Sequence, residues 1–124
     1  MICIEIMVIR ILWLISNMAN FTEEIINQVW QRATPVANND PNIWRQDYAG
    51  AWIRRDHYGK ESKYGWEIDH LKPVSRGGTD DMDNLYPLHW QNNRKKADSY
   101  PVFSTSISSE GVTNIEKLRS WRAE

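Results

Sequence analysis

The spacing of apolar residues changes along the chain from a helical period to a strand period. Apolar side chains recur at intervals of three and four across residues 21–33, which predicts an amphipathic helix there. Asn20 precedes this stretch and Glu23 follows three residues later, a pattern typical of a capped helix start. We expect the helix to end before Pro35, because the residue before a proline avoids the helical backbone region.

The middle of the chain predicts two short strands and a helix. Residues 66–70 alternate between apolar and polar side chains, the pattern of a half-buried strand. Residues 85–88 predict a second short strand, and the good helix formers of residues 90–98 predict a short helix. Between the strands, Gly77 and Gly78 permit backbone conformations that other residues resist, so we expect a loop there.

Two other segments carry weaker patterns. Residues 43–53 are rich in apolar side chains but contain Gly50, and we expect an irregular turn that leads into a strand. Residues 103–111 are rich in serine and show no strong period. Beyond them, Asn114 is expected to cap a final short helix.

Residues 1–17 are mostly apolar, and their role is open from sequence alone. Glu5 and Arg10 interrupt the stretch, which is also short for a membrane span. Three interpretations remain: an upstream extension before a true start at Met18, a signal or membrane anchor, or a real strand or helix. Apart from the second interpretation, which implies export or anchoring, we expect a cytoplasmic protein without stable membrane association.

The length and composition limit the architecture to one small domain. With 124 residues, we expect an α+β fold built on a two-strand, one-helix core, with an N-terminal helix and a short C-terminal helix. The domain is expected over residues 18–103, with its central motif at 64–101, followed by a tail over residues 104–124. The single cysteine, Cys3, excludes an internal disulfide and a cysteine-based zinc site.

Asp69 and His70 stand side by side at the end of the first predicted strand. Carboxylate and amide oxygens suit hard divalent cations, so Asp69 and Asn93 could hold one metal ion together with waters and a substrate phosphate. The neutral imidazole of His70 is a natural general base near pH 7. Asn84 is placed to hydrogen-bond across the intervening loop. An isolated Asp-His pair is more often a surface salt bridge, so the hypothesis depends on the four residues together.

Residues 64–101 also carry a longer pattern: Trp66-Glu67-Ile68-Asp69-His70-x-x-Pro73, Gly77-Gly78, Asp83-Asn84-Leu85 and Asn93-Arg94-x-Lys96. This pattern resembles the HNH endonuclease family, which has a ββα-metal fold. The resemblance implies a nuclease with one divalent metal ion, Mg²⁺ with Mn²⁺ or Ni²⁺ as substitutes, in a His-Asn-Asn variant. It implies His70 as general base, Asn84 as the residue that orders the loop, and Asp69 and Asn93 as metal ligands.

His89 lies five residues past Asn84, where zinc-bound relatives of the family place a structural cysteine. Since those cysteines are missing, we expect no structural zinc, and for His89 both a metal or phosphate contact and a packing role remain open. The net charge of −1 gives no overall signature of nucleic-acid binding, so the local distribution of charge matters more. The expected phosphate contacts are Lys72, Arg76, Arg94 and Lys96.

Two classes of function are therefore compatible with the sequence. The leading hypothesis is a metal-dependent endonuclease that hydrolyses phosphodiester bonds in DNA, with RNA as a possible substrate. The alternative is a non-catalytic module that binds nucleic acid or protein and retains the fold. The joint presence of Asp69, His70, Asn84 and Asn93 favours the enzyme. The sequence gives neither the target site nor the oligomeric state.

Overall fold

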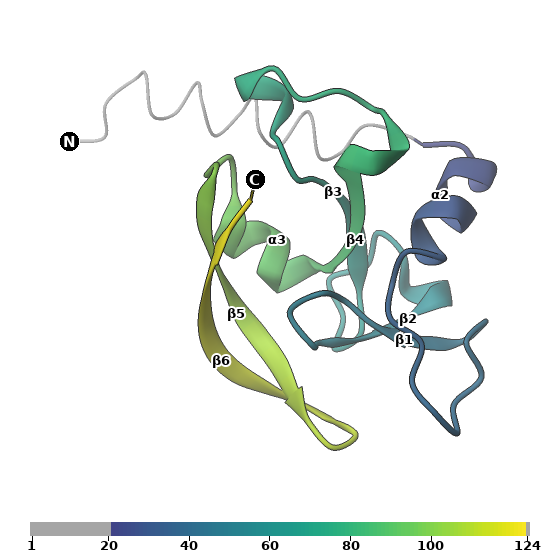
Figure 1. The fold of residues 1–124 in the computed structure, drawn as a ribbon. Helices are drawn as coiled ribbons and strands as arrows, with labels where there is room; N and C mark the ends of the chain where they lie inside the picture. The colour runs from purple at the N-terminus through teal and green to yellow at the C-terminus, as the bar shows by residue number, and fades with distance from the viewer. Residues whose placement is uncertain (1–20, 124) are drawn as a thin grey trace.

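The computed structural model of the protein describes residues 21–123, which form an α+β fold as predicted (Figure 1). Its strands pair into three separate antiparallel hairpins, β1–β2, β3–β4 and β5–β6. In chain order the helices and strands are α2 (Glu23–Trp30), β1 (Trp44–Gln46), β2 (Trp52–Arg54), β3 (Trp66–His70), β4 (Leu85–His89), α3 (Trp90–Lys96), β5 (Val102–Glu110) and β6 (Thr113–Arg122). Short 3₁₀ turns cover residues 55–57, 74–76 and 82–84.

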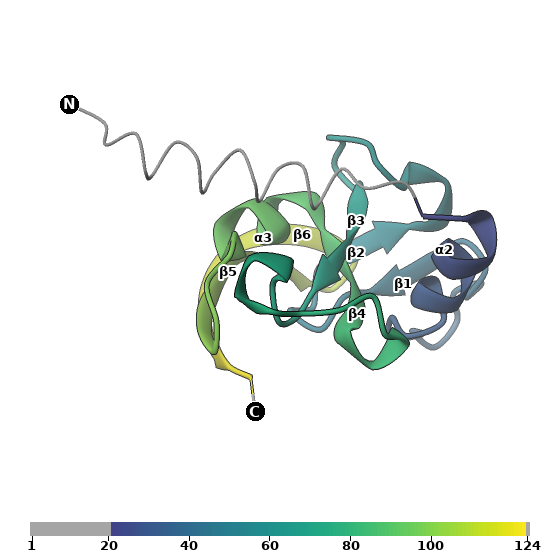
Figure 2. The same ribbon diagram turned by 90° about the horizontal axis from the view of Figure 1, so that it is seen from above.

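The β3–β4 hairpin and α3 form the centre of the fold. The two strands pair along their whole length, with His70 opposite Leu85 and Trp66 opposite His89. Helix α3 follows β4 without a break and packs on β3, β4 and β5. Both ribbon views place α2 on one side of this hairpin and β5–β6 on the other (Figures 1 and 2). The predictions of two strands and a helix in this segment are confirmed.

An aromatic and aliphatic core lies where α2 covers the central hairpin. Trp30 of α2 and Trp66 of β3 are almost fully buried, and their ring centroids lie 5.3 Å apart. Val29, Ile68 and Leu85 fill the space around them. Buried Trp side chains remove large apolar areas from water, which is the main source of stability for a domain of this size. Residues 21–123 contain no cysteine, so packing holds the motif in place of a disulfide or cysteine-bound zinc.

A second, polar cluster connects α3 with the hairpins on either side. The buried carboxylate of Asp47 accepts hydrogen bonds from the backbone amides of Ala49, Ala51 and His89, at 2.8–3.0 Å, and from Asn92 Nδ2 at 3.1 Å. Burial raises the pKa of Asp47 to about 6, although these donors act to lower it. The carboxylate thus ties the β1–β2 turn to the start of α3.

Asn92 extends this cluster to the C-terminal hairpin. Its Oδ1 accepts from the backbone amides of Ser106 and Ile107, at 2.9 and 2.7 Å, and its Nδ2 donates to Ile107 O at 2.9 Å. The pairing of β5 with β6 shifts register between Thr105 and Ile107, so the strand has backbone groups there that a side chain can satisfy. Asn92 therefore anchors α3 to β5 at this irregularity.

The predicted C-terminal helix is wrong, because the segment is a β-hairpin. Phe103, Thr105 and Ile107 alternate as buried residues on β5, with serines between them that hid the period of two. Asn114 caps no helix; its amide instead accepts from Trp52 N at 2.7 Å and donates to Trp52 O at 3.0 Å. Strand β5 also runs across the expected domain boundary between residues 103 and 104.

Two further differences concern the first half of the chain. Thr22 caps α2, with its Oγ1 accepting from Ile25 N at 3.2 Å, whereas Asn20 was expected to do so. Residues 44–54 form a complete hairpin, so strand β1 was missed. Residues 1–17, Met18 and Asn20 lie outside the described residues. Within residues 21–123, neither helix has the length and apolarity needed to cross a membrane.

We predict that Asn92→Ala will lower the free energy of unfolding by about 3 kcal/mol, because it leaves buried donors and acceptors on β5 without partners. The matched control is Gln91→Ala, which removes an exposed side chain from the same helix turn and should change stability by less than about 0.5 kcal/mol. Urea unfolding measures both. Equal effects of the two substitutions would contradict the anchoring role of Asn92.

Candidate active site

The end of strand β3 brings a buried carboxylate against a buried ammonium. The Asp69 side chain is 2% exposed, and its Oδ1 lies 3.1 Å from Lys96 Nζ. Lys96 is fully buried and also donates to the backbone carbonyl of His70 at 3.0 Å. The last turn of α3 is therefore attached to the last two residues of β3.

The second carboxylate oxygen of Asp69, Oδ2, is buried and has no hydrogen-bond partner among the described residues. The Tyr48 hydroxyl lies near Asp69, but outside hydrogen-bonding geometry. Burial raises the pKa of Asp69, while the Lys96 ammonium acts to lower it. A buried oxygen of this kind is stabilised by a cation or a donor, so Oδ2 marks a position where a ligand can bind.

Asn93 faces the same side of β3 as Lys96, because residues three apart lie on one face of a helix. Asn93 Nδ2 donates to Glu67 Oε1 at 3.0 Å. Glu67 also forms an ion pair with Arg94, which in turn reaches Glu61 at 3.3 Å. Glu67 and Asp69 are two apart on β3 and share its α3 face, so the strand and helix bring Asp69 and Asn93 to a common interface.

His70 points away from this interface, toward the loop that follows β3. Its side chain is 5% exposed, and its Nε2 lies 2.7 Å from Oδ1 of Asp80, a residue that is itself 75% exposed. The Phe21 ring lies against the imidazole, with 6.0 Å between centroids. Nδ1 of His70 makes no hydrogen bond to any residue from 21 to 123.

Asn84 closes the loop between β3 and β4. Its Oδ1 accepts from Lys72 N at 2.8 Å, and its Nδ2 donates to Lys72 O at 3.1 Å and to Thr79 O at 2.8 Å. Its backbone carbonyl accepts from Leu71 N at 2.9 Å. One side chain therefore holds both ends of the loop.

Gly77 and Gly78 allow the loop between β3 and β4 to bring its two ends close together. Gly77 has a φ of +89°, in the left-handed region that favours glycine. A Cβ on Gly78 would lie 1.7 Å from Lys72 O, so any other residue would force the backbone apart. The two loop ends can therefore approach each other only with glycine at position 78.

The oxygen-rich side of this site suits a hard divalent cation. Asp69 Oδ2 offers one anionic oxygen, and Asn93 contributes an amide oxygen at the same interface. Among residues 21–123, no group of three or more His, Cys, Asp or Glu side chains is placed to hold a metal. A site with few protein ligands is typical of Mg²⁺, which keeps several waters and binds substrate phosphates. These residues fit such an ion.

The comparison with protein families agrees with this geometry. Residues 55–99 match the family model of the HNH endonuclease. The chain carries an HNH domain. Members of this family are nucleases that generally act on nucleic acid with a divalent metal. No curated protein and no solved structure matches the chain.

His89 lies at the other end of the HNH domain from His70, because it pairs with the first residue of β3 and His70 is the last. It caps α3: its Nδ1 accepts from Gln91 N at 3.1 Å, and its Nε2 lies 2.9 Å from Lys63 O. Burial lowers the pKa of this histidine. Both ring nitrogens are engaged, so the packing role is the one that the structure supports.

The expected phosphate contacts of the HNH domain divide into three groups. Lys72 and Arg76 are exposed on the loop, with Arg76 Nε donating to Asp98 O at 2.8 Å. Arg94 is partly exposed and bridges two glutamates. Lys96 is fully buried, so it cannot reach a phosphate and the expectation for it is wrong. Two lysines adjacent in sequence, Lys95 and Lys96, differ completely in burial because only one faces β3.

Three residues of the site were missed or given another role in the sequence-based prediction. Glu67 binds Asn93, Lys96 holds Asp69, and Asp80 binds His70. The alternation of β3 could have identified Glu67, since it shares a strand face with Asp69. No sequence signal separates Asp80 from its acidic neighbours Asp81 and Asp83.

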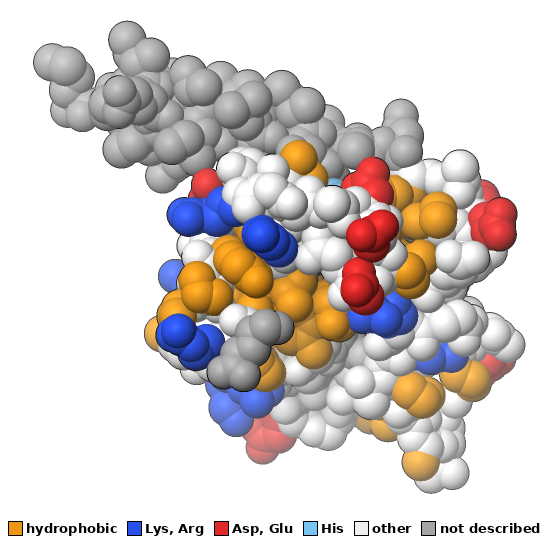
Figure 3. All heavy atoms as spheres, turned by 45° about the horizontal axis from the view of Figure 1, so that its top comes forward, with side chains coloured by type: hydrophobic (Ala, Val, Ile, Leu, Met, Phe, Trp, Pro, Cys, Tyr) orange, Lys and Arg blue, Asp and Glu red, His pale blue; other side chains and the backbone are white. Residues whose placement is uncertain are grey.

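The charges on the face of the HNH domain in Figure 3 are unevenly distributed. Acidic side chains gather near the middle of this face (Figure 3). Many Lys and Arg side chains lie toward one edge, with apolar side chains between them and the acids, and further Lys or Arg side chains lie directly beside the acids (Figure 3). The exposed acids of the loop are Asp80, Asp81 and Asp83. Acidic groups beside His70 repel a phosphate backbone.

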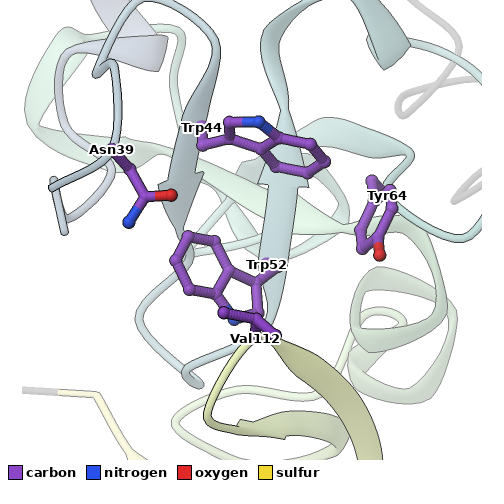
Figure 4. A pocket seen from close by; sticks show the side chains of 5 residues that line it. All are labelled: Asn39, Trp44, Trp52, Tyr64 and Val112. Atoms are coloured by element: carbon purple, nitrogen blue, oxygen red, sulfur yellow. The ribbon is translucent and has the colours of Figure 1, made fainter.

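An aromatic cavity of about 280 Å³ lies elsewhere on the surface (Figure 4). It is lined by Asn39, Trp44, Trp52, Tyr64 and Val112. Tyr64 precedes the first residue of β3, whereas His70 is the last residue of that strand. The cavity and the Asp69–His70 site are therefore at opposite ends of β3.

We predict that Lys96→Ala will lower the free energy of unfolding by about 3 kcal/mol, because it leaves the Asp69 carboxylate buried without its ion-pair partner. Lys95→Ala, at the exposed neighbouring position, should cost less than about 0.5 kcal/mol. Thermal or urea unfolding of the two variants makes the comparison. A Lys96 variant as stable as the Lys95 variant would show that the buried pair does not hold α3 on β3.

Proposed function

We propose that this protein is a metal-dependent endonuclease that hydrolyses phosphodiester bonds in DNA, with His70 as general base and one divalent metal ion. The observation that carries the proposal is the arrangement at the end of β3. There, within residues 21–123, Asp69 presents a buried oxygen without a hydrogen-bond partner, and the adjacent His70 is held through one ring nitrogen only. The HNH domain at residues 55–99 supports the same reaction class.

Each residue of the site has a distinct task in this proposal. Nδ1 of His70 takes a proton from the water that attacks phosphorus, since its Nε2 is already engaged by Asp80. Asp69 and Asn93 hold the metal ion, which is Mg²⁺ or a similar ion. When bound, such an ion stabilises charge on the phosphate oxygens and the leaving oxygen. Asn84 keeps the loop beside His70 in one conformation.

In this proposal, the exposed and partly exposed Lys and Arg side chains near the site bind the substrate. Lys72 and Arg76 extend from the loop that Asn84 closes, and Arg94 lies on the α3 face next to Asn93. Contacts of these side chains with phosphates would position the backbone of DNA and make its affinity dependent on salt. Lys96 supports the site from inside, through Asp69.

A non-catalytic binding module is the second candidate, and one observation favours it. Lys96 already pairs with Oδ1 of Asp69, which neutralises much of the charge that would attract a metal ion. In that case the protein would bind nucleic acid in a salt-dependent way without cleaving it.

Purified protein is expected to nick or cleave plasmid DNA with Mg²⁺, Mn²⁺ or Ni²⁺ and to lose this activity in excess chelator. His70→Ala should lower the rate by about 10²–10⁴-fold, the usual effect of removing a general base. His57→Ala is the matched control, because His57 contacts Ser62 in a surface turn and lies outside the site. Thermal unfolding of both variants shows whether they are folded. A His70→Ala variant that cleaves as fast as the wild type would disprove this mechanism.

A further inference from the structure

We propose that Asp80 is a positioning residue for His70, which fixes the imidazole with its proton on Nε2 and leaves Nδ1 to act on the attacking water. This inference rests on the proposed function, since it names the partner of the general base. It starts from the distance of 2.7 Å between His70 Nε2 and Asp80 Oδ1.

The direction of this hydrogen bond determines which nitrogen of the His70 ring carries the proton. An ionised carboxylate only accepts hydrogen bonds, so the nitrogen that faces it must carry the proton. The other nitrogen of the neutral ring then has a free lone pair, which is what a general base requires. Nδ1 of His70 makes no hydrogen bond to any described residue, so nothing within residues 21–123 competes for that lone pair.

Asp80 is exposed, so the loop must hold it in place. Asn84 Nδ2 donates to the carbonyl of Thr79, the residue directly before Asp80. Thr79 Oγ1 also donates to Asp81 Oδ2 at 2.9 Å, which fixes the turn on the other side of Asp80. With the close approach at Gly78, the backbone of Asp80 is restrained on both sides although its side chain faces solvent.

This arrangement explains how Asn84 contributes to the site. Within residues 21–123, the Asn84 side chain makes no hydrogen bond to His70 or Asp69, but it holds the loop that presents Asp80. The connection runs from Asn84 through Thr79 and Asp80 to the imidazole. This role also explains why the acidic side chain of Asp80, which would otherwise only repel DNA, lies beside His70.

The control for Asp80 is available in the same loop. Asp83 is exposed and forms no side-chain hydrogen bond or ion pair within residues 21–123. Asp80→Ala and Asp83→Ala remove the same charge from the same loop, so any general effect on DNA attraction appears in both. Only the first removes the partner of His70.

The first experiment observes the His70 ring by ¹⁵N-edited NMR in the metal-free protein, at a pH where the imidazole is neutral. His70→Gln identifies the signal among the three histidines. We expect a slowly exchanging Nε2–H signal in the wild type and in Asp83→Ala, and its loss in Asp80→Ala. Asp80→Asn keeps an acceptor oxygen and should retain part of the signal. A proton on Nδ1 in the wild type, or an unchanged signal in Asp80→Ala, would overturn the proposal.

The second experiment compares cleavage rates at saturating Mg²⁺. Asp80→Ala should lower kcat by about 10- to 100-fold, the usual cost of removing a hydrogen-bond partner that orients a site residue, with the same KM for DNA as Asp83→Ala. Asp83→Ala should keep the wild-type kcat. If Asp80→Ala instead weakens the affinity for Mg²⁺ and leaves the Nε2–H signal intact, Asp80 is a metal ligand and the inference is wrong. A wild type without cleavage would refute the proposed function, while the NMR result would still decide the hydrogen bond.

Discussion

The buried ion pair between Asp69 and Lys96 is the interaction on which the site depends. Taking both charges out of water is costly, and the pair offsets that cost only because α3 and β3 are held at a fixed separation. Lys96 also binds the carbonyl of His70, so the same ammonium fixes the strand end that carries this histidine. The packing around Trp66 and the Asp47–Asn92 cluster maintain this separation from either side. Stability and chemistry are thus coupled through one helix turn.

Two kinds of contact hold the described part of the chain, residues 21–123, together without cysteine ligands. Aromatic packing fixes α2 on the central hairpin, and a network of buried amide and carboxylate groups fixes α3 to its neighbours. Asn92 and Asn93 are adjacent in α3, but their side chains point in different directions. Asn92 binds the backbone of β5, whereas Asn93 faces β3 and the proposed metal site.

The sequence predicted the central motif well because its signals are local. Alternation in β3, the two glycines and Asn84 each specify structure within a few residues. The C-terminal hairpin was missed because its buried positions alternate with serines and because Asn114 binds Trp52, which is 62 residues away. Lys96 was assigned to phosphate because neighbouring lysines look alike until the helix is placed on the strand. Pairings across the chain are thus the part that sequence alone does not determine.

The central claim is that Asp69 and Asn93 hold one divalent ion beside His70. Substoichiometric Mn²⁺, added to ¹⁵N-labelled protein, tests this directly, because the ion broadens the NMR signals of nearby nuclei. We expect the strongest broadening at the amides of Asp69 and His70 and at the Asn93 side-chain amide. We also expect the broadening to be lost in Asp69→Asn. Broadening centred on Asp81 and Asp83, or none at any residue from 21 to 123, would contradict it.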